Sequence, residues 1–338
     1  VAIAGITTIN GNTFIGAEAG IDITQGENNV AIGRRSLYTA TTSGKNVLVG
    51  GWAGNAIAAA QTDTDGTVAV GYDALKALTS GQRNVVMGYQ AGLSITTMDD
   101  TVAIGYGAGD ALSTGTGRNT IIGSGAGSDL TTESQNVAIG SSALGGATGT
   151  SNVIAIGHRA AVALSHGDSS GTVAIGVLAL EAANGAHARN LAIGYYAGNA
   201  ITTGGSNTAI GYEAMKVHTT GTRNMAIGYG AMDDTDAGST SLGSVDNIFI
   251  GVDAGGGTWA DAASSYNVGI GNYVMDSALN GAINNVAIGY NALSAVTEGD
   301  RNIAIGHGAQ AFATTGGSNT AIGNSALYYN VTGTNNVA

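Results

Sequence analysis

A few side chains in this chain have the types that catalysis needs, but their spacing argues against it. Ser165, His166 and Asp168 are the residue types of a hydrolase triad, yet they are nearly adjacent, whereas a triad converges from separate parts of a chain. Asp63 with Asp65 is a carboxylate pair of the kind that cleaves glycosides. Because the chain also lacks a complete nucleophile elbow or phosphate-binding loop, we expect no enzymatic activity and no cofactor.

The acidic residues of two irregular stretches raise the alternative of calcium binding. Asp63 and Asp65 lie in one stretch, and Asp233, Asp234 and Asp236 lie in the other. Hard cations bind several carboxylate and carbonyl oxygens at once. Neither cluster has the spacing of a helix-loop-helix calcium site through to its final Glu. We therefore predict solvated acidic loops and no metal site, and keep calcium as the alternative.

These residues sit between copies of a five-residue phrase, seen best as Asn-Met-Ala-Ile-Gly at 224–228. Its closing glycine occurs eighteen times, and ten of the seventeen intervals are 17 residues. A short fixed period is the signature of a solenoid, in which each copy is one coil. The closing glycines are Gly16, Gly33, Gly50, Gly71, Gly88, Gly105, Gly123, Gly140, Gly157, Gly176, Gly194, Gly211, Gly228, Gly251, Gly271, Gly289, Gly306 and Gly323.

The repeat predicts an all-β fold, a parallel β-solenoid of about 18 coils that occupies residues 1–338 as a single domain. Irregular coils with insertions are expected near 51–66, 158–172 and 232–266. The chain ends inside another copy of the phrase, so we expect it to be a fragment of a longer fibre protein. Below, repeat positions are counted from the closing glycine, with negative numbers before it and positive numbers after it.

Composition limits the possible partners. The net charge is −12 with only 11 Lys and Arg, so we expect no binding to nucleic acid or to an anionic membrane surface. No apolar run approaches the roughly 18 residues of a membrane helix, which predicts no membrane insertion. The absence of Cys rules out disulfides and thiolate metal sites. There are 57 Gly and no Pro, which suits backbone ladders with tight corners.

Position −4 is Asn in fourteen copies, including Asn136, Asn207 and Asn224. In a stack of parallel coils the same position lies above itself at about 4.8 Å, so these amides can hydrogen-bond along the stack. We predict a structural Asn ladder. In one copy the Asn stands one place early, at Asn152, which suggests a one-residue bulge.

Positions −3 and −1 are mostly Val and Ile, whereas positions −2 and +3 are mostly Ala. Alternate strand residues point to opposite faces, so two facing Ala rows predict two close strands around a thin interior, with Val and Ile outside. An outward aliphatic stripe over eighteen coils exceeds what a monomer exposes, which predicts a homo-oligomer. Representative members of these rows are Ile139, Ile210 and Ile227 on the outside and Ala143, Ala214 and Ala231 on the inside.

Aromatic residues recur at position +1, as in Tyr195, Tyr212 and Tyr229. Consecutive coils would stack these rings, and Tyr72, Tyr89 and Tyr106 would form a second such ladder. A sugar-binding strip is the functional alternative. Both tryptophans, Trp52 and Trp259, fall in irregular coils, where they either contact a ligand or fill a local gap. We expect His158 and His307 at the same position to be surface substitutions.

Two polar rows complete the coil. Position −9 is Thr in thirteen copies, and in seven a second Thr follows, as in the Thr-Thr-Gly turn at 219–221, whose glycine can take positive φ. Arg or Lys precedes the Asn in six copies and predicts a solvated edge. The basic residues of this edge are Lys45, Arg83, Arg118, Arg189, Arg223 and Arg301.

The phrase Asn-Val-Ala-Ile-Gly at 136–140 and 285–289, with Ala three residues later, resembles the head repeats of YadA-like trimeric autotransporter adhesins. The longer form at 207–215 is similar to repeats of phage tail fibres. The resemblance implies a left-handed, homotrimeric β-roll with Val and Ile rows at the three-fold axis. The adhesin repeat is shorter, so the coil of this chain must be wider.

The first functional hypothesis is therefore a structural fibre shaft, about 85 Å long at the usual strand spacing, of a phage tail fibre or surface appendage that supports attachment. Its location would be extracellular and its partners would be two further copies of itself and a host-surface glycan or receptor. The alternative is a glycan-binding adhesin module that uses the extruded loops. Ice binding is a third, weaker hypothesis, because Thr219 and Thr220 would point to opposite faces.

Overall fold

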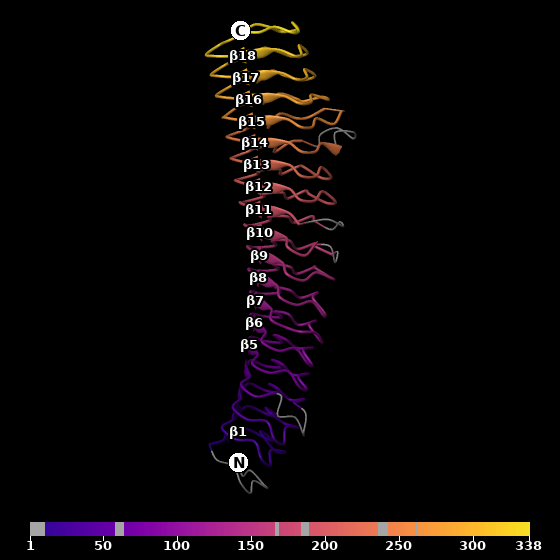
Figure 1. Ribbon diagram of the computed structural model, residues 1–338. Helices are drawn as coiled ribbons and strands as arrows, with labels where there is room; N and C mark the ends of the chain where they lie inside the picture. The colour runs from indigo at the N-terminus through magenta and orange to yellow at the C-terminus, as the bar shows by residue number, and fades with distance from the viewer. Residues whose placement is uncertain (1–10, 58–63, 166–168, 184–188, 236–242, 261) are drawn as a thin grey trace. The chain divides into compact units, whose positions relative to one another are not determined.

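The computed structural model describes residues 11–57, 64–165, 169–183, 189–235, 243–260 and 262–338. It comprises two compact units, Val1–Ser170 and Gly171–Ala338. Within each unit, three-residue strands stack in chain order, one strand per coil (Figure 1). This confirms the predicted all-β parallel solenoid.

The strands coincide with positions −3 to −1 of the repeat. In the first unit they are β1 (Thr13–Ile15), β2 (Val30–Ile32), β3 (Val47–Val49), β4 (Val68–Val70), β5 (Val85–Met87), β6 (Val102–Ile104), β7 (Thr120–Ile122), β8 (Val137–Ile139) and β9 (Ile154–Ile156). In the second unit they are β10 (Val173–Ile175), β11 (Leu191–Ile193), β12 (Thr208–Ile210), β13 (Met225–Ile227), β14 (Ile248–Ile250), β15 (Val268–Ile270), β16 (Val286–Ile288), β17 (Ile303–Ile305) and β18 (Thr320–Ile322).

Neighbouring strands are parallel and pair position for position. Ala209 of β12 lies opposite Ala226 of β13, and Ala226 lies opposite Phe249 of β14 although 23 residues separate the two. The extra residues of a long coil are therefore accommodated outside the strand. Each of the three strand positions therefore forms a continuous row along its unit.

The closing glycine is required by two features of the backbone. At Gly211 φ is +139°, a region that disfavours residues with a Cβ, and a Cβ there would lie 2.1 Å from the carbonyl oxygen of Gly228 in the next coil. Gly228 has the same relation to Gly251, with φ of +143° and the same 2.1 Å approach. Both conformation and space exclude a side chain at this position.

The interior differs from the predicted thin space between two strands. The Ala rows at −2 and +3 are buried, as in Ala209 and Ala214, but position +3 belongs to a turn and each described coil has a single strand. The expectation of two close strands is therefore wrong. Larger apolar side chains at +4 and +7, such as Leu144 and Leu130, share the interior with the Ala rows and widen it.

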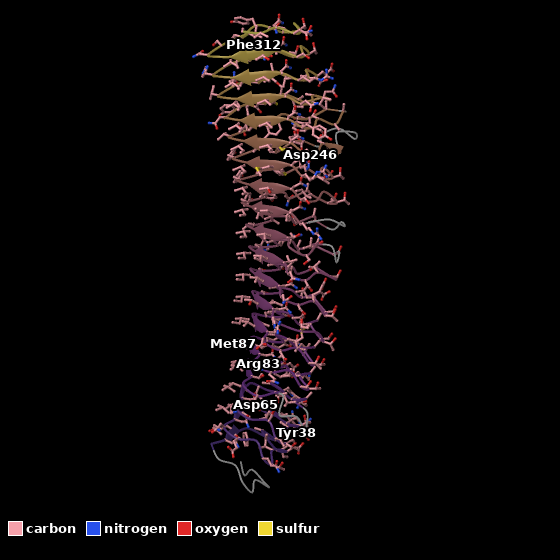
Figure 2. The ribbon with its side chains drawn as sticks, in the orientation of Figure 1. Tyr38, Asp65, Arg83, Met87, Asp246 and Phe312 are labelled. Atoms are coloured by element: carbon pink, nitrogen blue, oxygen red, sulfur yellow. The ribbon has the colours of Figure 1, made fainter. Side chains whose placement is uncertain are left out.

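The outward assignment of Val and Ile holds in the isolated chain. In most strands the middle residue is buried, while the residues at −3 and −1 are half-buried or exposed. In the first unit, Met87 projects from the strand side of the coils while Tyr38 lies on the opposite side (Figure 2). The outer row thus presents a strip of aliphatic side chains along each unit.

Two local predictions need correction. There is no bulge near Asn152, because Ile154 pairs in register with Val137 and Val153 simply replaces Asn at −4, with its N–H donated to the Oδ1 of Asn136 at 3.0 Å. The glycine of the Thr-Thr-Gly turn does not use positive φ. At Gly221 a Cβ would instead meet the carbonyl oxygen of Ser244 at 2.4 Å, so close approach excludes a side chain.

Within the described ranges, no helix is long and apolar enough to cross a membrane.

Candidate functional site

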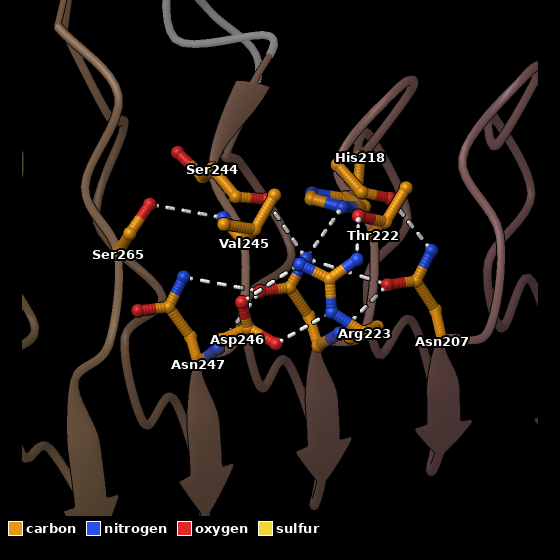
Figure 3. A network of polar contacts seen from close by, with 11 residues as sticks. Asn207, His218, Thr222, Arg223, Ser244, Val245, Asp246, Asn247 and Ser265 are labelled. Carbon is orange, nitrogen blue, oxygen red and sulfur yellow. Dashed lines mark hydrogen bonds and ion pairs between the residues drawn. The ribbon is translucent and has the colours of Figure 1, made fainter.

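The Asn side chains form a hydrogen-bonded ladder inside the second unit. The Oδ1 of Asn207 accepts the backbone N–H of Asn224 at 2.9 Å and its Nδ2 at 3.3 Å. The Oδ1 of Asn224 in turn accepts both groups of Asn247 at 3.0 Å, and the Nδ2 of Asn224 also donates to the carbonyl of Ser244 (Figure 3). These buried amides are satisfied by one another and by the turns, so their role is structural.

The same row is interrupted in the first unit. Asn136 accepts nothing from an Asn above it, because Val153 follows, and its Nδ2 donates to the carbonyl of Thr150 at 2.9 Å. Thr67 and Thr101 replace Asn in two further coils, and the buried Oγ1 of Thr67 has no hydrogen-bond partner in the structure. A Thr side chain is too short to continue the chain of amides.

Both predicted Tyr ladders are present. Adjacent rings of Tyr195, Tyr212 and Tyr229 have centroids 5.3 and 5.1 Å apart and are nearly parallel. The rings of Tyr72, Tyr89 and Tyr106 have both spacings at 5.7 Å. Neighbouring rings face each other along the stack, so a ladder presents ring edges and hydroxyl groups outward. It does not present the open ring faces on which sugars stack, which weighs against the glycan strip.

The tryptophans differ from each other. Trp259 is fully buried, donates its Nε1–H to the carbonyl of Gly255 at 2.9 Å and packs edge-on against Phe249. The ligand-contact expectation therefore fails for Trp259, because the indole fills an interior gap. Trp52 is half-buried at position +2, and the guanidinium carbon of Arg35 lies 4.8 Å from its ring centroid.

Trp52 lies in a small group of cations. Lys76 and Arg34 are 5.3 and 5.8 Å from its ring centroid, within the range of cation–π attraction. Arg35 is also paired with Glu18, and Lys76 is paired with Asp73 at 3.1 Å. Three cations thus lie near the ring, and two of them, Arg35 and Lys76, are paired with carboxylates. This arrangement favours a packing role for Trp52.

Among the acidic side chains, Asp65 is held by polar contacts, whereas Asp233 and Asp276 are half-buried and have raised pKa values. Asp65 accepts the backbone N–H of Gly44 at 2.8 Å and lies 3.7 Å from the Nζ of Lys45. Burial, with the nearby charge of Asp253, raises the pKa of Asp233 to about 6, and the same causes raise that of Asp276 to about 6. In the part of the chain that the structure describes, no group of three or more His, Asp or Glu could hold a metal ion.

Several sequence candidates fall on residues outside the described ranges. Asp63 and Asp236 of the acidic stretches are among them, as are His166 and Asp168 of the triad-like sequence. Ser165 is described and exposed.

The basic edge is solvated, and Lys45, Arg83 and Arg223 of this edge form ion pairs with carboxylates. Arg223 donates two parallel hydrogen bonds to Asp246 in the next coil, at 2.7 and 2.8 Å (Figure 3). Arg83 pairs in the same way with Asp100. The hydrogen bond from Arg223 lowers the pKa of Asp246. A surface hollow of about 290 Å³ beside Arg223 is lined by Thr203, Gly205, Ser206, Thr222 and Arg223. Its only charged lining group already faces a carboxylate.

The Thr row is also satisfied internally. The hydroxyl of Thr79 donates to the carbonyl of Thr96 at 3.0 Å, and that of Thr96 donates to the carbonyl of Ser113 at 2.9 Å. These hydroxyl hydrogens therefore stabilise neighbouring coils, which weakens the ice-binding hypothesis further.

No protein-family model matches this chain, and no curated protein is significantly similar to it. The resemblance to adhesin heads and tail-fibre repeats therefore rests on the repeat phrase and on the solenoid fold. The outward aliphatic row is the feature that a single chain does not explain, because nothing within the described part of one chain covers it.

Proposed function

We propose that this chain is a structural shaft segment of an extracellular fibre, in a phage tail fibre or surface appendage, and that it assembles as a homotrimer through its aliphatic rows. The fibre would hold an attachment element away from its base. Left-handed coils around a three-fold axis are the geometry that the repeat resemblance implies.

The observation that carries the proposal is the exposure of the −3 and −1 rows. Ile154, Ile248 and Ile303 are 37 to 40% exposed, in strands whose other face is buried. A repeated aliphatic strip of this kind exceeds the apolar patches usual on monomers, and burying it between chains would remove it from water. Most polar groups of the Asn and Thr rows bond to neighbouring coils, and the basic edge is polar, so the aliphatic strip is the surface best suited to assembly.

Solution mass tests the assembly. We expect light scattering on the chain, after removal of a cleavable trimerising clamp, to give a mass near three times 33.1 kDa. Replacing Ile193, Ile210 and Ile227 by Ser should release monomers whose β-sheet circular dichroism is kept. The matched control replaces Ser206 and Thr222, on the polar edge, by Asp and should remain trimeric. A stable wild-type monomer would contradict the proposal.

A further inference from the structure

The Tyr ladders bring identical oxidisable side chains together at the surface. In the second unit Tyr195, Tyr212 and Tyr229 are 42, 43 and 56% exposed, so their phenol groups are accessible to solutes. The ring planes of Tyr212 and Tyr229 differ by only 4°. In the first unit Tyr89 is 47% exposed between two similarly exposed neighbours.

The backbone fixes this arrangement. Each Tyr directly follows a closing glycine. The positive φ of that glycine and its close contact with the backbone of the next coil leave no room for a side chain, so the backbone beside each Tyr is fixed. The strand that precedes it pairs in strict register, as Ile210 with Ile227. Neighbouring Tyr residues are therefore held one coil apart, while their exposed rings can still rotate on a ps–ns timescale.

We propose that these ladders are sites of oxidative tyrosine–tyrosine coupling, in which a one-electron oxidant, such as a peroxide-activated haem or a photo-oxidised metal complex, links rings of consecutive coils. Each phenol gives one electron to the oxidant and one proton to water. The two phenoxyl radicals join through carbons ortho to their oxygens, and loss of the two ring hydrogens to oxygen restores both aromatic rings. The net change is one C–C bond formed, two C–H bonds broken, and two electrons and two protons released.

Proximity favours this pairing over coupling between molecules. Two radicals whose rings are held 5.1 to 5.7 Å apart meet at a high effective concentration, and the rings need only turn edge to edge to bond. The product is a covalent staple between coils. Because a solenoid opens by separation of neighbouring coils, such a staple would slow local opening where it forms.

The test is oxidation of the whole chain with visible light, a ruthenium tris-bipyridine sensitiser and persulfate, followed by mass spectrometry of cross-linked peptides. Equal amounts of ¹⁴N- and ¹⁵N-labelled chains are oxidised after separate assembly and mixing. We expect dityrosine between Tyr195 and Tyr212, between Tyr212 and Tyr229, and within the ladder of the first unit. These links should join peptides of one isotope and their yield should be independent of protein concentration.

Two internal controls make the test specific. Tyr212→Phe keeps a stacked ring but removes the central phenol, so links in this ladder should fall at least tenfold while those of Tyr72, Tyr89 and Tyr106 are unchanged. Tyr266 is 55% exposed and stacks on no ring among the described residues, so it should couple rarely. Coupling of Tyr266 at the ladder rate, mixed-isotope links as the main product, or no effect of Tyr212→Phe would each overturn the proposal.

Discussion

Inside a coil, the side chain at one position limits the size of those at two others. Five coils carry a residue larger than Ala at −2, and every one of them has Gly at +4. In the coil of Ile121, a Cβ on Gly127 would lie 3.0 Å from the Cδ1 atoms of Ile121 and Leu130. The following coil has the reverse sizes, with Ala138, Leu144 and Ala147. Interior volume is thus shared among −2, +4 and +7.

This sharing predicts the effect of exchanging sizes. Gly127→Leu should destabilise the chain by about 1–3 kcal/mol, because the interior is already filled. Adding Ile121→Ala and Leu130→Ala should recover most of the loss, since the triple variant reproduces the sizes of the next coil. Urea unfolding measures both variants. Leu130→Ala alone is the control and should be destabilised by the cavity it leaves; failure of the triple variant to recover would contradict the shared-volume account.

A second residue-scale prediction concerns Asp233, whose pKa in the folded chain is raised to about 6 by burial and by Asp253. In the unfolded chain an Asp titrates near pH 3.9, so the folded state holds the proton more tightly. Stability contributed by this group is therefore highest below about pH 4, falls as pH rises to about 6, and is constant above.

The variant Asp233→Asn removes this titration. We expect it to raise the free energy of unfolding at pH 7 and to have little effect at pH 4, as measured by urea unfolding at both values. Asp234→Asn is the control, because its carboxylate accepts a hydrogen bond from Thr258 at 2.6 Å and should not show the same gain. Equal effects at both pH values would show that charge burial at Asp233 is not the cause.

At the scale of one element, the coil after β12 contains a buried histidine at position +7, where most other coils have Leu, Ile or Ala. The Nδ1 of His218 lies 2.8 Å from the Oγ1 of Thr235, and its Nε2 lies 3.2 Å from the Nδ2 of Asn224. The amide of Asn224 is fixed by the ladder, so its NH₂ donates and the imidazole Nε2 must accept. His218 is therefore neutral in this arrangement.

Protonation would place two donors against each other in the interior. The folded coil therefore accommodates the neutral imidazole, and we expect acidification from pH 8 to pH 5 to favour opening of this coil. The other described acidic and basic groups on the same and the next coil are Glu213, Lys216, Arg223, Asp233, Asp234 and Asp246. Of these, Asp233 shifts stability in the opposite direction. Hydrogen exchange of residues 212–235 between pH 8 and 5 measures the effect.

The variant His218→Leu supplies the control, since Leu130 occupies the same position in another coil. It should remove the acid-induced increase in exchange while leaving the basal protection at pH 8 unchanged or higher. An increase that persists in His218→Leu would assign the acid response to another group.

At the scale of the whole molecule, the repeat made the strands, their register and their two faces predictable, because a period of two is visible within the three residues of a strand. The turns were less predictable. Positions +2 and +4 take positive φ throughout each unit, yet they hold residues as different as Arg35, Trp52 and Met215. Their conformation follows from stacking against the next coil, a tertiary effect that residue type does not reveal.

The candidate site residues were likewise predictable in part. The sequence predicted the Asn and Tyr ladders, because identical residues at a fixed period must stack. It did not separate Trp52 from Trp259, since the burial of Trp259 depends on Phe249 in the same irregular coil. The interior rows at +4 and +7 were missed because their residues vary in type and size from coil to coil. The signal for them was the pairing of a large −2 residue with Gly at +4.

The two units differ in the continuity of their polar interior, and this predicts a difference in local stability. From Asn190 to Asn336 every coil of the second unit has Asn at −4, whereas Thr101 interrupts the row of the first. Thr101→Asn would connect Asn84 to Asn119 and should stabilise its coil by about 0.5–1.5 kcal/mol, the net value of a hydrogen bond. The reverse change, Asn207→Thr, should cost about 1–3 kcal/mol, because it leaves buried amide groups of neighbouring rungs without partners.

Native-state hydrogen exchange on the intact chain distinguishes these effects from a general change in stability. Thr101→Asn should slow exchange of the backbone N–H of Asn119 and leave the second unit unchanged. Asn207→Thr should accelerate exchange of Asn224, whose N–H is donated to the Oδ1 of Asn207. Because side-chain amides polarise one another along a ladder, acceleration should extend beyond Asn224 to Asn247 and decline with each rung. If exchange changed only at Asn224, the rungs would act independently and the ladder would be a row of separate hydrogen bonds.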